Sequence, residues 1–170
     1  AAQEKGVYCF LKHFALNDQE TNRMGVAVMS NEQTARQIYL NPFEITVREG
    51  NAHGAMVSMN RIGNKWTGAH YGLMTETLRN EWGFEGVAIT DQASFDVFAY
   101  EDLRAGLAAG TDLWLNTDTE LWKLSKDDMN DTVVTNMQRA AKNIVFAVSR
   151  SNAMNGLSST SKIVKIIPVW

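Results

Sequence analysis

The sequence predicts an α/β fold with a parallel sheet, and three observations support this prediction. Short apolar runs recur along the 170 residues, each beginning at or just after a glycine. Each run ends in polar residues and is followed by a stretch with helical spacing. No Pro-, Ser- or Gly-rich linker divides the chain, whose prolines are Pro42 and Pro168. Alternation of buried-type strands with helices is typical of a parallel sheet covered by helices.

Four of the apolar runs are predicted to be strands. Their residues are mostly apolar rather than alternating, which is the pattern of parallel strands buried on both faces. The runs cover residues 6–11, 54–58, 86–90 and 111–115. The polar residues that follow them, in the same order, are Lys12 and His13, then Met59, Asn60 and Arg61, then Asp91 and Gln92, and finally Asn116 and Thr117.

Four helical stretches are expected between and after these strands. Residues 34–40 form the end of a helix that stops before Asn41 and Pro42. Residues 71–82 place Met74, Leu78 and Trp82 four apart, with Gly83 as a stop signal. Residues 100–109 form a shorter helix closed by Gly110. Residues 127–148 form the longest helix, whose apolar face comprises Met129, Val133, Met137, Ala140, Ile144 and Val148.

Composition excludes several classes of protein. Hydrophobic content is 45% and charged content 21%, as in an ordinary globular domain. The net charge of −3 argues against a partner such as nucleic acid or an anionic membrane, since both need a basic excess. No apolar run is long enough to span a bilayer. The single cysteine, Cys9, allows no internal disulfide and fits a cytoplasmic protein, with secretion as the alternative.

The number of strand–helix units bears on the size of the fold. Four units fall short of an eight-unit barrel, which needs about 250 residues. A four-stranded doubly wound sheet remains possible at this length. Residues 151–170 have no helical period, and their apolar end requires burial against another surface. The chain is therefore expected to be part of a larger body.

Chemistry in such sheets gathers at the carboxyl ends of the strands, so the polar residues there are the candidates. Asp91 is either a catalytic carboxylate or an N-cap for the segment that follows. Lys12 and His13 are either donors to a polyhydroxylated substrate or a solvated basic pair. The charged run of Asp18, Glu20 and Arg23 is interpreted as a salt-bridged loop.

No metal or nucleotide site is expected. His53 and His70 are predicted to lie on loops, and no spacing of histidines and carboxylates typical of a metal site is present. The sequence contains neither of the glycine-rich phosphate-binding loops. Trp66 is interpreted as a core residue, with a sugar-lining role as the alternative.

Five blocks in chain order resemble glycoside hydrolase family 3, the β-glucosidase and β-xylosidase type. The longest block ends on Asp91, at the position of the family's nucleophile. The blocks are KHFALNDQETNR (12–23), RQIYLNPFE (36–44), AMVSMNRIGNKW (55–66), LMTETLRNEWGFEGVAITD (73–91) and AGTDLWL (109–115). The resemblance is collinear from Lys12 to Leu115.

The resemblance implies a fold and a reaction. The fold is the C-terminal half of a TIM-like (β/α)8 barrel over residues 1–150, with residues 151–170 as a C-terminal tail. The reaction is retaining, exo-acting hydrolysis of β-glycosides, with β-glucosidase as the first expectation. Asp91 would be the catalytic nucleophile, and no metal or other cofactor would be needed. Lys12 and His13 would bind sugar hydroxyls, and Met56 would pack beside the sugar.

Three positions depart from the family pattern and bear on sugar preference. Met59 stands where a tyrosine usually bonds the nucleophile, Gln92 replaces a tryptophan, and Thr90 replaces a serine. Met59 and Gln92 remain candidate substrate-binding residues.

The family resemblance also implies partners that lie outside this chain. These are the N-terminal half of the barrel and an α/β sandwich domain that carries the general acid/base, within the same polypeptide or on another chain. The tail after the barrel favours an enzyme in which the sandwich comes first. Two alternatives remain: a non-catalytic sugar-binding or structural half-barrel, and an unrelated four-stranded α/β domain.

Overall fold

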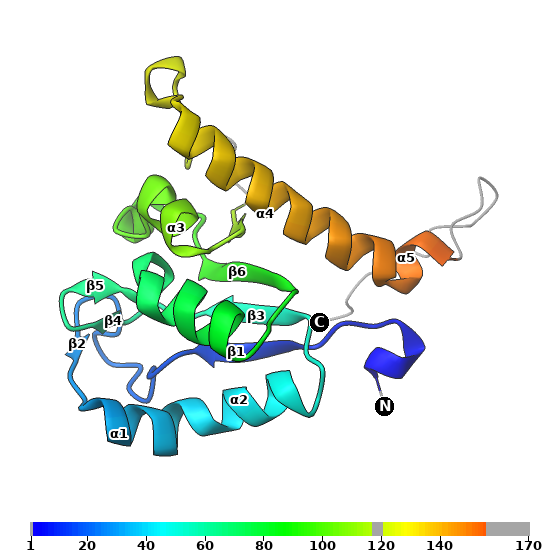
Figure 1. The fold of residues 1–170 in the computed structure, drawn as a ribbon. Coiled ribbons are helices and arrows are strands. Elements are labelled where there is room, and N and C mark those ends of the chain that lie inside the picture. The colour runs from blue at the N-terminus through cyan, green and yellow to red at the C-terminus, as the bar shows by residue number, and fades with distance from the viewer. Residues whose placement is uncertain (1, 117–120, 156–170) are drawn as a thin grey trace, which may run out of the picture.

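The computed structural model describes residues 2–116 and 121–155 of the chain. At its centre is a parallel sheet in the order β1-β3-β6-β7 (Figure 1). This observation confirms the α/β class and the parallel sheet. The four strands are β1 (Phe10–Phe14), β3 (Gly54–Val57), β6 (Val87–Gln92) and β7 (Leu113–Leu115).

The order of the strands in space follows their order in the chain without reversal. A doubly wound sheet would reverse direction at a switch point, so that alternative is wrong. Each connection between neighbouring strands contains a helix, as in an arc of a (β/α) barrel. The helices are α1 (Glu32–Thr34), η2 (Ala35–Leu40) and α2 (Asn41–Arg48), then η4 (Gly72–Glu81), α3 (Leu103–Ala109), α4 (Asp131–Arg150) and α5 (Asn152–Asn155).

A second, smaller sheet is built from the loops that leave the carboxyl ends of β1 and β3. Its strands are β2 (Ala27–Val28), β4 (Arg61–Ile62) and β5 (Lys65–Trp66). β2 pairs with β4 in parallel and β4 with β5 in antiparallel fashion. Four 3₁₀ turns complete the described fold: η1 (Gln3–Lys5), η3 (Thr67–Ala69), η5 (Asp96–Phe98) and η6 (Lys126–Asp128).

The core lies between the sheet and the helices α2 and η4. The residues predicted from their spacing are all buried: Met74 and Leu78 on η4, and Trp82 at its C-cap. Phe14 at the end of β1 packs edge-to-face against Phe43 and Trp82, with ring centroids 5.2 and 5.9 Å away. Full burial of one such side chain is worth about 1.5–3 kcal/mol, so this cluster fixes how the helices lie on β1.

The first strand begins four residues later than predicted. Gln3–Lys5 form a 3₁₀ turn, which Gly6 closes in the left-handed conformation at a φ of 74°. The chain pairs with β3 only from Phe10 onwards, so Lys12 and His13 belong to strand β1 instead of following it. The peptide bonds Lys12–His13 and Phe14–Ala15 are cis.

The prediction that a helix ends before Asn41 and Pro42 is wrong. The helix continues through Pro42 to Arg48. A π-helical segment, Ala35–Leu40, precedes the proline, which then lies in the first turn of α2. A proline is tolerated there because its missing N–H has no helical partner to lose.

The two later helices begin after their predicted starts. Asp102 caps α3 by accepting from the Ala105 N–H, so the helix starts at Leu103. Ser125 and Asp128 form a reciprocal capping box around η6, which separates residues 126–128 from the long helix. Asn130 then caps α4 by accepting from the Val133 N–H. Local side-chain capping therefore overrides the apolar periodicity at both starts.

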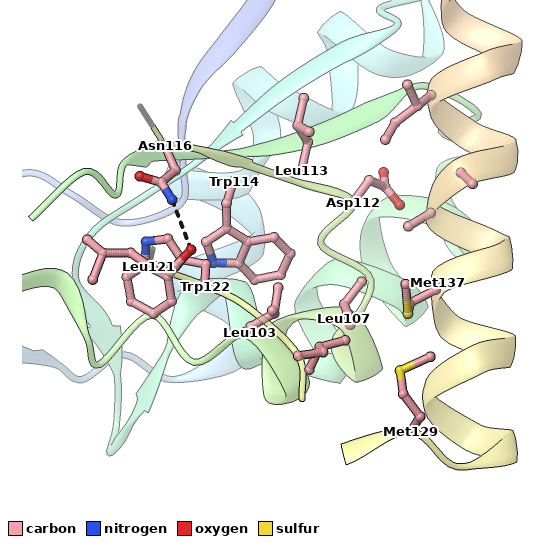
Figure 2. A pocket seen from close by; sticks show the side chains of 14 residues that line it. Leu103, Leu107, Asp112, Leu113, Trp114, Asn116, Leu121, Trp122, Met129 and Met137 are labelled. Atoms are coloured by element: carbon pink, nitrogen blue, oxygen red, sulfur yellow. Dashed lines mark hydrogen bonds between the residues drawn. The ribbon is translucent and has the colours of Figure 1, made fainter. Parts of the chain in front are cut away.

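An apolar cavity of about 560 Å³ lies between edge strand β7, helices α3 and α4, and residues 121–124 (Figure 2). Leu103, Leu107 and Met137 line it. Met129 and Met137, two members of the apolar face expected from the sequence, are 42% and 40% exposed. On the strand itself, Leu113 and Leu115 are 40% and 41% exposed. The apolar surface on this side of the sheet is therefore incompletely covered by the described part of the chain.

Two further points concern Thr117 with the C-terminal tail, and a possible membrane span. Thr117 and most of the predicted tail, residues 156–170, lie outside the described residues. Among residues 2–116 and 121–155, no helix is long and apolar enough to cross a membrane.

Candidate active site

Asp91 lies at the carboxyl end of β6, the penultimate residue of that strand. Its Oδ1 accepts a hydrogen bond of 2.8 Å from the Gln92 N–H. Its side chain is 15% exposed, so one face is open to solvent. The N-cap interpretation is wrong, because Asp91 is part of a strand and the next helical turn begins after Phe95.

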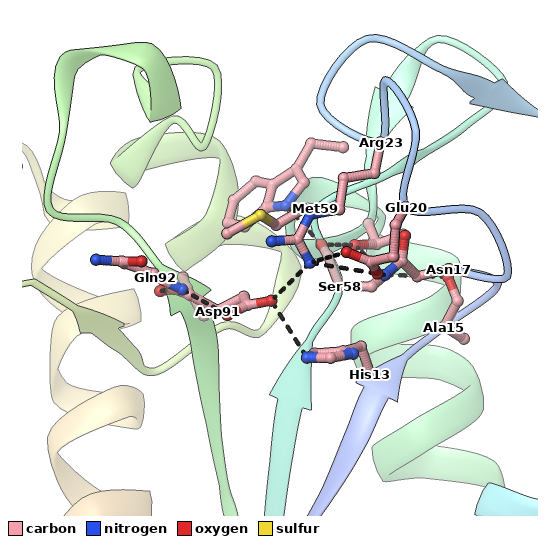
Figure 3. Close-up of polar contacts among 12 residues, drawn as sticks. His13, Ala15, Asn17, Glu20, Arg23, Ser58, Met59, Asp91 and Gln92 are labelled. Atoms are coloured by element: carbon pink, nitrogen blue, oxygen red, sulfur yellow. Dashed lines mark hydrogen bonds and ion pairs between the residues drawn. The ribbon is translucent and has the colours of Figure 1, made fainter. Parts of the chain in front are cut away.

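Nitrogen atoms of two side chains, His13 and Arg23, lie near the other carboxylate oxygen of Asp91. His13 Nε2 lies 3.2 Å and Arg23 Nη1 3.6 Å from Asp91 Oδ2 (Figure 3). His13 comes from β1, two strands away from β6, and Arg23 from the loop after β1. The sheet thus brings together side chains that are 68 to 78 residues apart in the sequence. Their donors orient the carboxylate and leave its solvent-facing side free.

The charged run after β1 has two roles. Glu20 and Arg23 form the predicted salt bridge at 3.1 Å, and Asn17 donates to Glu20 at 3.0 Å. Arg23 also reaches Asp91, which the sequence interpretation missed. A charged run in one loop gives no signal of a contact with a strand far along the chain.

Lys12 and His13 differ in their surroundings although they are adjacent. His13 is half-buried and contacts Asp91, whereas Lys12 is exposed. Within residues 2–116 and 121–155, the Lys12 side chain makes no hydrogen bond or ion pair. Its side chain is therefore open to solvent.

The other predicted substrate-binding residues differ in how far their side chains are buried. Met59 is 1% exposed, and its backbone carbonyl accepts a hydrogen bond of 2.9 Å from the Tyr100 hydroxyl. Met56 lies inside β3, opposite Ile89 of β6, and is partly buried. Gln92 is exposed beside Asp91 at the end of β6 (Figure 3). The position next to the carboxylate is therefore polar and open.

A buried polar cluster holds the loop beneath the site. The Ser58 hydroxyl lies 3.0 Å from both the Ala15 carbonyl and the Thr67 hydroxyl. Thr67 donates to the Ser58 carbonyl at 2.6 Å, and Trp66 Nε1 donates to the same carbonyl at 3.0 Å. Trp66 is 4% exposed, so its interpretation as a core residue is confirmed.

The two remaining histidines do not build a metal site. Burial lowers the pKa of both His53 and His70 below the ordinary value. In the described ranges, no group of three or more histidine, cysteine or acidic side chains is arranged to hold a metal ion.

A second aspartate of the same sheet, Asp112, lies at the amino end of β7 and makes contacts only inside the fold. Its side chain is fully buried and accepts from Arg79 at 2.6 Å, from the Ala88 N–H at 2.9 Å and from Asn143 at 2.9 Å. Burial raises the pKa of Asp112, and the Arg79 guanidinium and the hydrogen bonds oppose that rise. Both oxygens of this carboxylate are engaged and the side chain is sealed from solvent, so it cannot reach a substrate.

Comparison with known proteins now adds to this geometry. The family model described as the Glycosyl hydrolase family 3 N terminal domain matches residues 1–151. The chain belongs to glycosyl hydrolase family 3. Members of this family hydrolyse glycosides, and the α/β fold with its parallel sheet agrees with the family's barrel domain.

Two similar proteins are named for different glycosidase activities. A β-glucosidase from Ruminococcus albus is 41% identical over 86 residues, which is 51% of this chain and 9% of that protein. An exo-α-(1→6)-L-arabinopyranosidase from Bifidobacterium longum is 32% identical over 154 residues, 89% of this chain and 19% of that protein. The chain thus spans about a tenth to a fifth of the length of these relatives.

A solved structure in the family has the same fold. The β-glucosidase 3B from Thermotoga neapolitana superimposes with a TM-score of 0.75 at 27% identity. The superposition covers 90% of this chain and 22% of that one. This chain and that enzyme therefore share the same fold over most of the length of this chain.

Proposed function

We propose that this chain supplies the nucleophile, Asp91, of a retaining, exo-acting β-glycosidase of family 3. One observation carries the proposal. Asp91 is a carboxylate at the carboxyl end of a parallel strand, held by His13, Arg23 and a backbone N–H and open on one side. That arrangement fits a group that must be oriented and ionised, yet free to attack.

The proposed reaction is a double displacement. Asp91 attacks the anomeric carbon and forms a covalent glycosyl–enzyme while the aglycone leaves. Water then attacks the same carbon and releases the sugar and the Asp91 carboxylate. A retaining enzyme needs a second carboxyl group about 5–5.5 Å from the first, to protonate the leaving group and then activate the water. We assign that group to a part of the enzyme outside this chain.

We further propose that residues 1–150 are the second half of a (β/α)8 barrel. Strands β1 and β7 are both edges of an open sheet, which the other half of the barrel would close. The exposed leucines of β7 and the adjoining apolar cavity support a covering by further barrel elements. An α/β sandwich domain completes the proposed enzyme, and its place before the barrel remains part of this proposal.

The sugar is proposed to be glucose, with arabinopyranose as the second candidate. Relatives are named for β-glucosidase and for α-L-arabinopyranosidase activity. Arabinopyranose lacks the hydroxymethyl group of a hexopyranose. Comparing turnover of aryl β-glucosides and aryl α-L-arabinopyranosides by the complete enzyme decides between the two.

A non-catalytic sugar-binding half-barrel is the second candidate function. It is favoured by Met59, a buried thioether that presents no strong donor to Asp91, and by the polar Gln92. His13, Arg23 and the Gln92 N–H supply other donors to the carboxylate, which favours catalysis.

Covalent trapping tests the proposed reaction directly. The complete enzyme is incubated with a 2-fluoro-glycoside that carries a good leaving group, and the labelled peptide is identified by mass spectrometry. We expect the label on Asp91 and none in the Asp91→Asn variant. A label on Glu20, Asp96 or Asp112 contradicts the assignment, and binding of the sugar without label or turnover supports the non-catalytic alternative.

The half-barrel architecture has a separate test. Residues 1–170 are expressed alone, and their oligomeric state and thermal unfolding are measured. Open strand edges and uncovered apolar surface should make the isolated chain aggregate and remain inactive. A soluble monomer with a cooperative transition and normal turnover would contradict the need for the other barrel half.

A further inference from the structure

The side chain of Arg61 contacts two loops other than its own. Arg61 begins β4, in the loop that follows β3, and it is partly buried. Its Nη1 donates a hydrogen bond to the backbone carbonyl of Met24, in the loop between β1 and β2. Its guanidinium also lies over the ring of Tyr100, 4.5 Å from the centroid, in the loop that follows β6. One side chain therefore joins the loops at the carboxyl ends of three neighbouring strands.

The loop between β1 and β2 carries Arg23, which directly precedes Met24 and lies 3.6 Å from the Asp91 carboxylate. Within this loop, the Val26 N–H donates to the Asn22 carbonyl at 2.8 Å, so the turn closes on itself. The pairing of β2 with β4 that follows is only two residues long. The hydrogen bond to the Met24 carbonyl therefore ties down the backbone directly beside Arg23.

Tyr100 is fixed on the other side of Arg61. Its hydroxyl donates to the Met59 carbonyl at 2.9 Å, and Met59 is 1% exposed at the end of β3. The face of an aromatic ring attracts a guanidinium, so the ring holds Arg61 in place while the hydroxyl holds the ring. Arg61 and Tyr100 thus connect the loop that carries Arg23 to the buried end of β3.

We propose that Arg61 is a positioning residue for Arg23 and, through it, for Asp91. The guanidinium of Arg61, seated on the Tyr100 ring, holds the Met24 carbonyl and so keeps Arg23 within reach of the Asp91 carboxylate. Arg61 acts on the backbone of the loop and has no need to touch the substrate, and no proton or covalent bond changes at it. The inference rests on the proposed role of Asp91.

Loss of Arg61 frees the loop that carries Arg23. The Arg23 guanidinium also pairs with Glu20 at 3.1 Å, but Glu20 is exposed and belongs to the same loop, so this pair moves with the loop. Arg23 should then stay with Glu20 and leave Asp91. A misplaced donor changes the orientation of the attacking carboxylate, and a displacement of about 1 Å in such geometry costs on the order of 10²-fold in rate.

The rate of glycosyl–enzyme formation is the quantity that should change. In the complete enzyme, kcat/KM on a dinitrophenyl β-glycoside reports this step, because dinitrophenolate leaves without protonation. We expect Arg61→Met to lower it about ten- to hundredfold. Arg61→Lys should recover part of the loss, since it keeps a cation and a donor but lacks the planar guanidinium.

Arg48→Met is the matched control. Arg48 also donates to a backbone carbonyl, that of Glu81 at 2.9 Å, but it ends α2, six residues before β3 begins. It therefore lies toward the amino ends of the strands, and its loss should leave kcat/KM unchanged.

A double-mutant cycle separates positioning from a general structural role. Methionine variants at Arg61 and Arg23 are made singly and together. If Arg61 acts through Arg23, the loss caused by Arg61→Met should largely disappear when Arg23 is already methionine. An equal loss in both backgrounds overturns the proposal, and so does wild-type kcat/KM in Arg61→Met. If Arg61→Met fails to fold, the same cycle is run with Arg61→Lys and judged in the same way.

A crystal structure of the Arg61 variant in the complete enzyme gives a readout independent of activity. Arg23 should be displaced from Asp91, and an unmoved Arg23 overturns the role of Arg61. If Asp91→Asn is inactive while Arg61→Met has wild-type kinetics, only the role of Arg61 fails. If Asp91→Asn remains fully active, the proposed function fails, whatever the position of Arg23.

Discussion

Asp91 and Asp112 are two aspartates of one sheet with opposite environments. Asp112 stands at the amino end of β7, fully buried, with an arginine, an asparagine and a backbone N–H on its oxygens. Asp91 stands at the carboxyl end of β6, partly exposed, with His13 and Arg23 near one oxygen and the Gln92 N–H on the other. Each carboxylate has donors on both oxygens, so the difference between them is access: Asp112 is sealed inside the fold, whereas Asp91 reaches solvent and can meet a substrate.

The difference follows from the direction of the strands. Helices α4 and η4 pack against the sheet where β7 begins, so Arg79 and Asn143 can enclose Asp112. At the carboxyl ends the chain leaves the sheet in loops. His13 of β1 and Arg23 of the following loop meet Asp91 there, and the carboxylate remains partly exposed (Figure 3). The same geometry stabilises one end of the sheet and leaves the other for chemistry.

Substitution of Asp91 by asparagine has the largest expected effect. A neutral amide is a poor nucleophile, so kcat should fall on the order of 10⁴-fold or more in the complete enzyme. The fold should change little because the side chains are nearly isosteric. Steady-state kinetics together with thermal unfolding check both parts; full activity in this variant rules out Asp91 as the nucleophile.

Substitution of Asp112 by asparagine should do the reverse. Removing one partner of a buried ion pair leaves Arg79 uncompensated and costs about 3–5 kcal/mol. We expect a large fall in the midpoint of unfolding and near-normal kinetics in the protein that remains folded. Asp127→Asn, at an exposed position, is the control. A normal midpoint in Asp112→Asn would mean that this network does not stabilise the sheet.

Alanine substitution of Lys12 or His13 tests whether these side chains bind the substrate beside Asp91. Each alanine variant should lose a charge-assisted hydrogen bond worth about 1.5–3 kcal/mol, a ten- to hundredfold loss of kcat/KM. His13→Ala should also slow labelling of Asp91 by a 2-fluoro-glycoside, because His13 orients that carboxylate. Lys12→Ala should act mainly through substrate binding. Near-wild-type kinetics in both variants would remove the pair from the site.

The exposed ion pair between Arg36 and Glu81 should have the smallest effect. The pair is 2.7 Å long with both side chains well exposed, and Arg36 lowers the pKa of Glu81. Glu81→Gln should cost about 0.2–1 kcal/mol at neutral pH. Because the pKa is lowered in the fold, this stabilisation is present above the ordinary carboxyl pKa and disappears as the pH falls below it. Chemical unfolding at pH 7 and pH 3 measures the difference; an effect as large as that of Asp112→Asn would contradict the distinction between surface and buried pairs.

Local sequence patterns predicted most of the fold. Apolar runs gave β3, β6 and β7 to within two residues, and the spacing of Met74, Leu78 and Trp82 gave the buried face of η4. Asp91 was selected as the candidate nucleophile because it follows a buried-type strand and ends the longest block of the family resemblance. Periodicity failed where local geometry decided, as at Gly6, Pro42 and Ser125.

The apolar composition of a strand and the polar residue that ends it can be read from a few neighbouring positions in the sequence. The residues that pair with each carboxylate cannot be read in this way. Arg23 reaches Asp91 and Arg79 reaches Asp112 only because distant segments meet in the folded sheet. Three-dimensional packing therefore decided which of these two carboxylates is open to solvent and which is sealed inside the fold.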